Sequence, residues 1–186
     1  ITDELVDQVL PDGRCEFVAD IARPLPVALI LRMLGMPDGV RADLTQWVRM
    51  IFHGRSVEEH LEGYRAAFGY LGEWLREAIE RHPDEGMVVP AFLEARVDGR
   101  PLTFDEMHSM SMLLIGAGVD TATSQLTHAM RYFAEHREAR ARIAAEPAVI
   151  PAAIEELLRR YGIANITRVV RHDMTYRGVA MKAGDL

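Results

Sequence analysis

Cysteine is almost absent from this 186-residue sequence, which holds one, Cys15. A single cysteine excludes a disulfide framework and suits a reducing compartment, so we expect a cytoplasmic protein. Basic residues are also in the minority, with 21 Lys and Arg against 28 Asp and Glu. Nucleic-acid binding needs Lys and Arg clustered on one face, so no nucleic-acid partner is expected. The longest apolar runs, such as Val27 to Leu31, are far too short to span a bilayer, so we expect no membrane partner.

Most of the remaining sequence has the hydrophobic spacing of helices. Helices are predicted over 1–9, 25–34, 40–52, 57–81, 104–135, 139–144 and 150–161, with loops at 37–39, 53–55, 82–86 and 98–101. After Gly162, a change to Val, Ile, Thr and Tyr predicts two or three short strands, with a hairpin turn at 182–185. No internal repeat, low-complexity segment or linker divides the chain. The sequence therefore predicts a mainly α fold in a single domain over residues 1–186.

The helix predicted over 104–135 carries an unusual interruption, Gly116-Ala117-Gly118-Val119-Asp120-Thr121. Each glycine costs a helix roughly 1 kcal/mol relative to alanine and leaves backbone exposed. An acid and a hydroxyl follow directly, so the stretch is typical of a place where a flat group comes close to a helix. The structural alternative is a close crossing with another helix, with Asp120 and Thr121 facing solvent.

A second pattern lies downstream, in the helix predicted over 150–161. Glu156 and Arg159 are three residues apart and share one face, so they can pair. Such pairs are common on helices and weak when exposed. Arg168 then follows in an apolar segment with strand character. The order of interrupted helix, Glu-x-x-Arg pair and arginine is more specific than any of the three alone.

That order resembles the cytochrome P-450 haem-thiolate monooxygenases along nearly the whole chain. Residues 104–135 are similar to the family's central I helix, and Glu156 with Arg159 matches the family's K-helix pair. The segments Asp98-Gly99-Arg100-Pro101-Leu102-Thr103 and Glu155-Glu156-Leu157-Leu158-Arg159-Arg160 are most similar to the soluble bacterial camphor hydroxylase group. The resemblance implies the central portion of the cytochrome P-450 fold, from helices D/E through K, with short β-strands at the C-terminal end.

The resemblance also implies a catalytic site with haem b, iron protoporphyrin IX, as its cofactor. The family's oxygen-binding groove corresponds to Ala117 and Gly118, whose lack of bulk would leave room for dioxygen. Thr121 would steady the bound oxygen with a hydroxyl that both donates and accepts. Asp120 would relay protons from the surface.

Three further residues correspond to positions that hold the haem. Arg168 matches an arginine that binds a haem propionate, and Glu156 with Arg159 would form a buried pair beneath the haem. Beside the substrate, the resemblance places Leu113, Ala117 and Ala164.

The surroundings of Asp120 carry their own expectation. A partly buried carboxylate needs a cationic partner to stay ionised, and we expect His53 or Arg55 to be that partner. The segment 52–56, which would form the roof of the pocket, differs in composition from the camphor hydroxylase group. So does Ile166, where that group's best-known members carry an acid.

The family's iron ligand is a cysteine in a loop well beyond the Glu-x-x-Arg helix, and it would lie beyond Leu186. Cys15 lies far upstream of the long helix, so we interpret it as a small, semi-buried structural residue and expect no metal ligand in this chain. The sequence is therefore interpreted as a single partial domain from the middle of a larger enzyme. This fragment alone is not expected to be active.

The function implied is a haem-dependent monooxygenase that activates dioxygen and hydroxylates a small apolar substrate, such as a terpenoid. Its electrons would come from a ferredoxin and an NAD(P)H-dependent ferredoxin reductase. The alternative is a non-catalytic helical ligand-binding or regulatory module. Three other clusters receive a structural interpretation. The histidines are interpreted as surface or half-buried residues and the methionines as core residues: His108, His128 and His136, and Met107, Met110 and Met112. The arginines are interpreted as a solvated basic face: Arg137, Arg140 and Arg142.

Overall fold

The computed structural model describes residues 1–81, 84–164 and 166–186. Its helices are α1 (Thr2–Val9), α2 (Pro24–Leu34), α3 (Arg41–His53), α4 (Val57–Arg81), α5 (Val88–Glu94), α6 (Phe104–Gly118), α7 (Asp120–Glu135), α8 (Arg137–Ala145) and α9 (Ile150–Arg160). Single turns connect them at η1 (Leu10–Asp12), η2 (Val18–Ala22), η3 (Asp38–Val40) and η4 (Pro147–Val149). Two antiparallel strand pairs join β1 (Arg96–Val97) to β2 (Arg100–Pro101) and β3 (Met174–Tyr176) to β4 (Val179–Met181). The mainly α prediction is confirmed.

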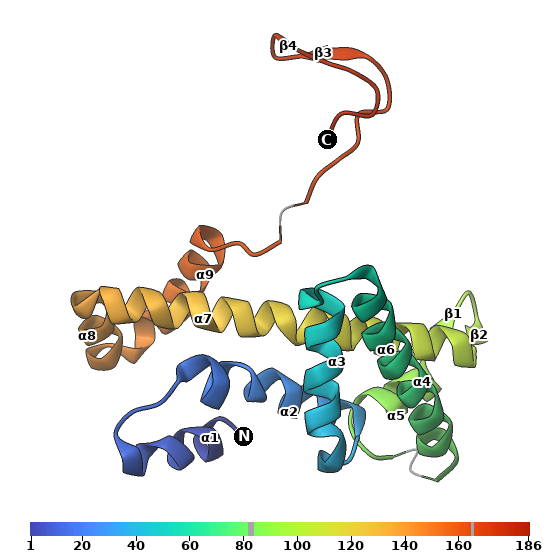
Figure 1. Cartoon of the computed structure of the whole chain (residues 1–186), viewed down its shortest axis with the longest axis horizontal. Helices are drawn as coiled ribbons and strands as arrows, with labels where there is room; N and C mark the ends of the chain where they lie inside the picture. Colours follow the sequence, from blue (N-terminus) through green and yellow to red (C-terminus); the bar gives the residue numbers. More distant parts are fainter. Residues whose placement is uncertain (82–83, 165) are drawn as a thin grey trace.

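The helix predicted over 104–135 forms as two collinear helices, α6 and α7, which cross the whole molecule (Figure 1). The helices α2, α3 and α4 lie against α6 and the start of α7, whereas α8 and α9 lie near the far end of α7. Thr103 begins α6 with a capping box, because its hydroxyl accepts from the Glu106 backbone and Glu106 accepts from the Thr103 backbone. This end of the long helix is therefore fixed by local hydrogen bonds.

The core lies between α2, α3, α4 and the buried side of α6. Apolar side chains of α2 and α3 pack there against Leu71 of α4 and against Ile115 and Val119 of the long helix. A second buried cluster links the end of α4 to α5 and to Met107 at the start of α6. Met107 and Met112 are buried core residues as predicted, but Met110 is 47% exposed. The opposite side of α6 is thus left open.

One predicted connection takes a different form in the structure. In the loop predicted at 98–101, Asp98 and Gly99 form the two-residue turn of the β1–β2 hairpin, because both adopt positive φ, and Arg100 and Pro101 form β2. Residues 82 and 83 of the loop predicted at 82–86 lie outside the described residues.

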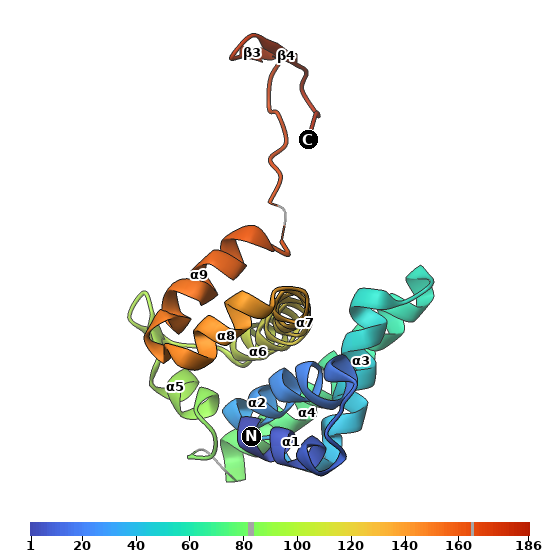
Figure 2. The same cartoon turned by 90° about the vertical axis from the view of Figure 1, so that its left-hand side faces the viewer.

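The C-terminal segment leaves α9 and extends away from the helices to the β3–β4 hairpin (Figures 1 and 2). The two strands confirm the prediction of short strands after Gly162. The predicted position of the hairpin turn, 182–185, is wrong, since the turn lies at Arg177 and Gly178, which both have positive φ. Residues 182–185 form a second turn that folds back on Val170, whose N–H donates to the Asp185 carbonyl at 2.9 Å.

Candidate active site

The long helix breaks at Val119, inside the motif that the sequence singled out. Val119 has φ −89° and ψ −60°, and α7 begins at the next residue, Asp120. Directly after the break, the Thr121 hydroxyl donates to the Ala117 carbonyl at 2.5 Å. A threonine hydroxyl that bonds four residues back competes with the helical ladder and bends the helix. The break therefore coincides with the hydroxyl that the family resemblance assigns to oxygen.

The glycine at 118 faces a neighbouring helix. A Cβ on Gly118 would lie 3.0 Å from Cδ1 of Ile30 in α2, and one on Gly116 would lie 3.8 Å from the Phe52 ring. At Gly118 the structure thus supports the close helix crossing that was the alternative interpretation. Ala117, by contrast, is exposed on the other side of the helix.

An exposed stripe runs along the open side of this helix. Met110, Leu113, Ala117 and Thr121 follow one another at spacings of three and four residues, so they share one face. Leu113 is 70% exposed, whereas Ile115, two residues on, is 1% exposed. The structure therefore brings Leu113, Ala117 and Thr121 together on one apolar surface that ends in a hydroxyl. We call these four residues the open stripe.

Asp120 turns away from the open stripe toward α3. Its Oδ1 lies 2.6 Å from Nε2 of His53, and the Asp120 side chain is 24% exposed. The expectation of a partly buried carboxylate with His53 or Arg55 as partner is thus confirmed for His53. Arg55 donates its backbone N–H to Glu59 instead.

The Glu156–Arg159 pair forms on α9 with two hydrogen bonds of 2.6 Å. Hydrogen bonding from Arg159 lowers the pKa of Glu156, and the same bonds raise the pKa of Arg159. The expected burial of the pair is not found, since the Arg159 and Glu156 side chains are 70% and 59% exposed. Water screens an exposed pair of this kind, so it contributes little to stability by itself.

Arg168 and Ala164 lie on the segment that follows α9, and both are exposed. The Arg168 guanidinium donates to the carbonyl of the preceding residue, Thr167, at 2.9 Å. This segment leads away from the open stripe toward the β3–β4 hairpin (Figure 1). The structure therefore does not bring Arg168 or Ala164 to Leu113, Ala117 and Thr121.

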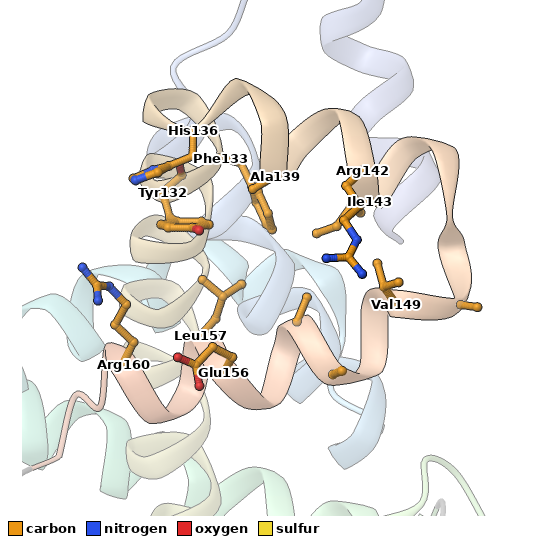
Figure 3. A pocket seen from close by; sticks show the side chains of 13 residues that line it. Tyr132, Phe133, His136, Ala139, Arg142, Ile143, Val149, Glu156, Leu157 and Arg160 are labelled. Carbon is orange, nitrogen blue, oxygen red and sulfur yellow. The ribbon is translucent and has the colours of Figure 1, made fainter.

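A cavity of about 750 Å³ lies between the end of α7, α8 and α9 (Figure 3). Its walls are mostly apolar, with Phe133, Ile143 and Leu157 among them, and Glu156 and Arg160 lie at its polar side. Tyr132, where the cavity meets α7, is roughly 16 Å along the helix from Thr121 at 1.5 Å per residue. Size alone therefore does not make this cavity the candidate active site.

The described residues offer no group of three His, Cys, Asp or Glu side chains that could hold a metal ion. Cys15 is an exposed free thiol, so the expectation that it is semi-buried is wrong. His108 is buried and its Nε2 lies 2.8 Å from the Phe68 carbonyl, while His128 stacks on Tyr161. The structural interpretation of these histidines is consistent with these contacts. In the same described part of the chain, no helix has the combination of length and hydropathy needed to cross a membrane.

We compared the chain with known proteins and solved structures. No protein-family model matches the chain. It is 30% identical to the mycinamicin IV hydroxylase/epoxidase of Micromonospora griseorubida over 191 residues, covering 100% of the chain and 48% of that protein. It is 30% identical to a cytochrome P-450 of Bacillus subtilis over 171 residues, covering 91% of the chain and 42% of that protein. CYP109E1 from Bacillus megaterium, solved in complex with testosterone, superposes on 99% of the chain with a TM-score of 0.85 and 27% identity. The chain belongs to the cytochrome P-450 family.

The chain spans about half the length of the cytochrome P-450 relatives it matches. Cytochromes P-450 use haem, and the open stripe fits one face of that flat, apolar group. Ala117 adds little bulk there, Leu113 offers apolar contact and Thr121 supplies a hydroxyl at the end. The exposed thiol of Cys15, by contrast, lies on the segment between η1 and η2, so it is a poor match for an axial iron ligand.

Proposed function

We propose that this chain forms the oxygen-handling part of a haem-dependent monooxygenase that hydroxylates a small apolar substrate. The observation that carries the proposal is the helix break at Val119, which sets the Thr121 hydroxyl at the end of the open stripe and Asp120 beside it. Haem, when bound, supplies the binding and reduction of dioxygen. The residues of this chain position the substrate, exclude water and deliver protons.

Residues of the open stripe and its surroundings have distinct tasks in this proposal. Thr121, whose hydroxyl donates to the Ala117 carbonyl, would be the hydroxyl available to hold or pass a proton beside the haem. Ala117 keeps this face of the helix slim, while Gly118 does the same on the opposite face, against α2. Leu113 would contact the substrate and exclude water, and the family resemblance assigns Ala164 the same task. Asp120 passes protons toward Thr121 from the α3 side.

Haem retention falls to residues of the C-terminal part of the chain. Arg168 would neutralise a propionate through charge-assisted hydrogen bonds, and Glu156 with Arg159 would support the haem region from α9. Electrons would come from a ferredoxin and its NAD(P)H-dependent reductase in the cytoplasm. A terpenoid is one substrate class of the right chemistry, and the testosterone bound to the similar CYP109E1 supports an apolar substrate.

The test is Thr121→Ala in the haem-loaded enzyme. Without the hydroxyl, NADH consumption should stay similar while hydrogen peroxide rises and product per NADH falls about tenfold, since one aligned donor is lost. Thr121→Ser should restore most of the coupling. Thr127→Ala is the matched control, because it removes the same kind of bond, from Oγ1 to the Thr123 carbonyl at 2.8 Å, farther along α7. Unchanged coupling in Thr121→Ala would remove Thr121 from the mechanism.

A further inference from the structure

His108 is one of two polar side chains that the described part of the chain buries, and it lies between α6 and α4. Its Nε2 is 2.8 Å from the backbone carbonyl of Phe68 in α4. Because a carbonyl oxygen only accepts, this nitrogen carries the hydrogen and the imidazole donates it. The oxygen has two lone pairs, so it can accept the helical bond of α4 as well. The contact therefore attaches a side chain of α6 to the backbone of α4.

Glycine and aromatic rings surround the imidazole. A Cβ on Gly72 would lie 3.0 Å from Cε1 of His108, so the ring lies directly on the backbone of α4. The ring centroid of His108 is 3.8 Å from that of Phe68 and 5.7 Å from that of Phe104. The Arg76 guanidinium lies 4.5 Å over the Phe104 ring and donates to the Gly72 carbonyl at 3.3 Å. These contacts join one turn of α6 to two turns of α4, so α4 cannot slide along α6 without breaking the bond to Phe68.

The helix α3 is held closely against α4. Gly63 of α4 allows this approach, since a Cβ there would lie 2.6 Å from Cβ of Met50 in α3. Farther along, Nδ1 of His60 is 2.8 Å from the Ile51 carbonyl, which again joins a side chain of one helix to the backbone of the other. A displacement of α4 along α6 would therefore carry α3 with it.

The last turn of α3 brings Phe52 to the edge of the open stripe. A Cβ on Gly116 would lie 3.8 Å from Cζ of Phe52, and Gly116 directly precedes Ala117. The Phe52 side chain stays 42% exposed there. His108 and Gly116 are roughly 12 Å apart along α6 at 1.5 Å per residue. The attachment of α4 at His108 thus lies about two turns from the place where Phe52 meets the long helix.

We propose that His108 is a positioning residue whose hydrogen bond to the Phe68 carbonyl fixes α4 along α6 and, through α3, sets the place of Phe52 beside the open stripe. The inference rests on the proposed function, because Phe52 matters as a wall only where an apolar substrate meets the stripe. His108 acts through α4 and α3 and not on the reacting atoms. Substrate binding should therefore depend on His108, whereas oxygen handling at Thr121 should not.

The first test needs no substrate and follows 4-fluorophenylalanine in place of Phe52 by ¹⁹F NMR. His108→Phe keeps a ring but loses the donor, so the ¹⁹F line should move and the amides of α4 should exchange several-fold faster. His108→Gln keeps an N–H donor and should hold the line near its wild-type position. His136→Phe is the matched control, because it removes a similar bond, from Nδ1 to the Tyr132 carbonyl at 2.8 Å, at the far end of α7.

Two further measurements keep the ¹⁹F result decisive. The ¹⁵N shifts of the His108 ring should identify Nε2 as the protonated nitrogen, and an unprotonated Nε2 overturns the proposal. Gly72→Ala leaves His108 in place but presses a Cβ against its ring, so it should also move the Phe52 line. A lower melting temperature in His108→Phe with an unmoved ¹⁹F line would make His108 a structural residue only and overturn the positioning role.

The second test follows oxidation of testosterone, as an apolar probe, by the haem-loaded enzyme. His108→Phe should raise KM about fivefold while kcat stays within about twofold and peroxide per NADH is unchanged, the pattern of lost binding without lost chemistry. His108→Gln should restore KM. If the wild type neither consumes NADH nor oxidises the probe, the proposed function has failed. A competent wild type whose KM is the same in His108→Phe instead refutes the positioning role alone.

Discussion

At Gly118 the neighbouring helix limits the size of the side chain. The δ1 methyl of Ile30 occupies the space next to the position of a Cβ, at 3.0 Å, so α2 and α6 can cross closely only while residue 118 stays small. Ala117 is next in sequence but exposed, and its small size serves the open stripe. Adjacent small residues of one motif therefore act on opposite sides of the same helix.

Gly118→Ala should change the free energy of unfolding by less than about 1 kcal/mol, because the gain in helix propensity is offset by displacement of Ile30. In an Ile30→Val background the δ1 methyl is gone, so the same substitution should stabilise by about 0.5–1 kcal/mol. Urea denaturation of the four proteins gives the coupling between the two sites. Equal effects of Gly118→Ala in both backgrounds would contradict the crossing as the reason for the glycine.

Among the helices, α3 and α4 depend on a close approach at Gly63. A Cβ there would lie 2.6 Å from Cβ of Met50 and 3.0 Å from the Trp47 carbonyl, where no side-chain rotation can relieve the contact. Gly63→Ala should therefore destabilise the protein by about 1–3 kcal/mol. Gly69→Ala, on the same helix with nothing within 4 Å, should stabilise it by about 0.5–1 kcal/mol. Thermal denaturation that ranks the two variants the other way would refute this account of the pair.

The start of α6 should resist acid. Two hydrogen bonds from Arg100 and the bonds at Thr103 lower the pKa of Glu106 from 4.5 to about 2. Since the pKa is lower in the folded state, the stabilisation is fully present above the ordinary carboxyl pKa and is lost as pH falls toward about 2. The Glu106 carboxyl ¹³C signal should accordingly titrate well below the other glutamates, and in Arg100→Gln it should move back toward them. A Glu106 with the ordinary carboxyl pKa would show that the bonds from Arg100 and Thr103 do not hold its carboxylate.

Hydrophobic spacing predicted most helices because each buries one apolar face. It did not predict α5, which is short and begins in Met87-Val88-Val89-Pro90, a run with no helical period of its own. It did not reveal the break at Val119 either, because the apolar spacing continues on both sides of it. Such a break arises from side-chain hydrogen bonds and from packing against α2, which spacing along one helix does not encode.

For the whole molecule, substitutions of the exposed Glu156–Arg159 pair can distinguish an effect on folding from an effect on haem binding. We expect Glu156→Ala or Arg159→Ala to leave thermal unfolding of the haem-free protein almost unchanged and to reduce haem content several-fold. Arg168→Ala should weaken haem retention and shift the reduction potential, because a cation beside a propionate is lost. Glu77→Ala is the matched control, since it breaks an exposed pair with Arg81 on α4. Normal haem loading in Glu156→Ala would leave the pair as a surface ion pair.

The candidate site was only partly predictable from the sequence. Helical spacing places Leu113, Ala117 and Thr121 on one face, and the need of a buried carboxylate for a cation led to His53. The choice between His53 and Arg55 required the fold, because it depends on where α3 ends relative to α7. The exposure of Glu156 and Arg159 depends on which elements cover α9, and spacing along α9 does not contain that information.

The division of the long helix at Val119 also changes its electrostatics. In one continuous helix the peptide dipoles cancel along its length, and partial charges remain at the two distant ends. The break instead creates a second positive end in the interior of the molecule, where α7 starts at Asp120 and Thr121. Negative charge that develops beside the Thr121 hydroxyl, or resides on Asp120, meets this positive end within the first helical turn. The break at Val119 therefore also gives the centre of the molecule a fixed preference for anions.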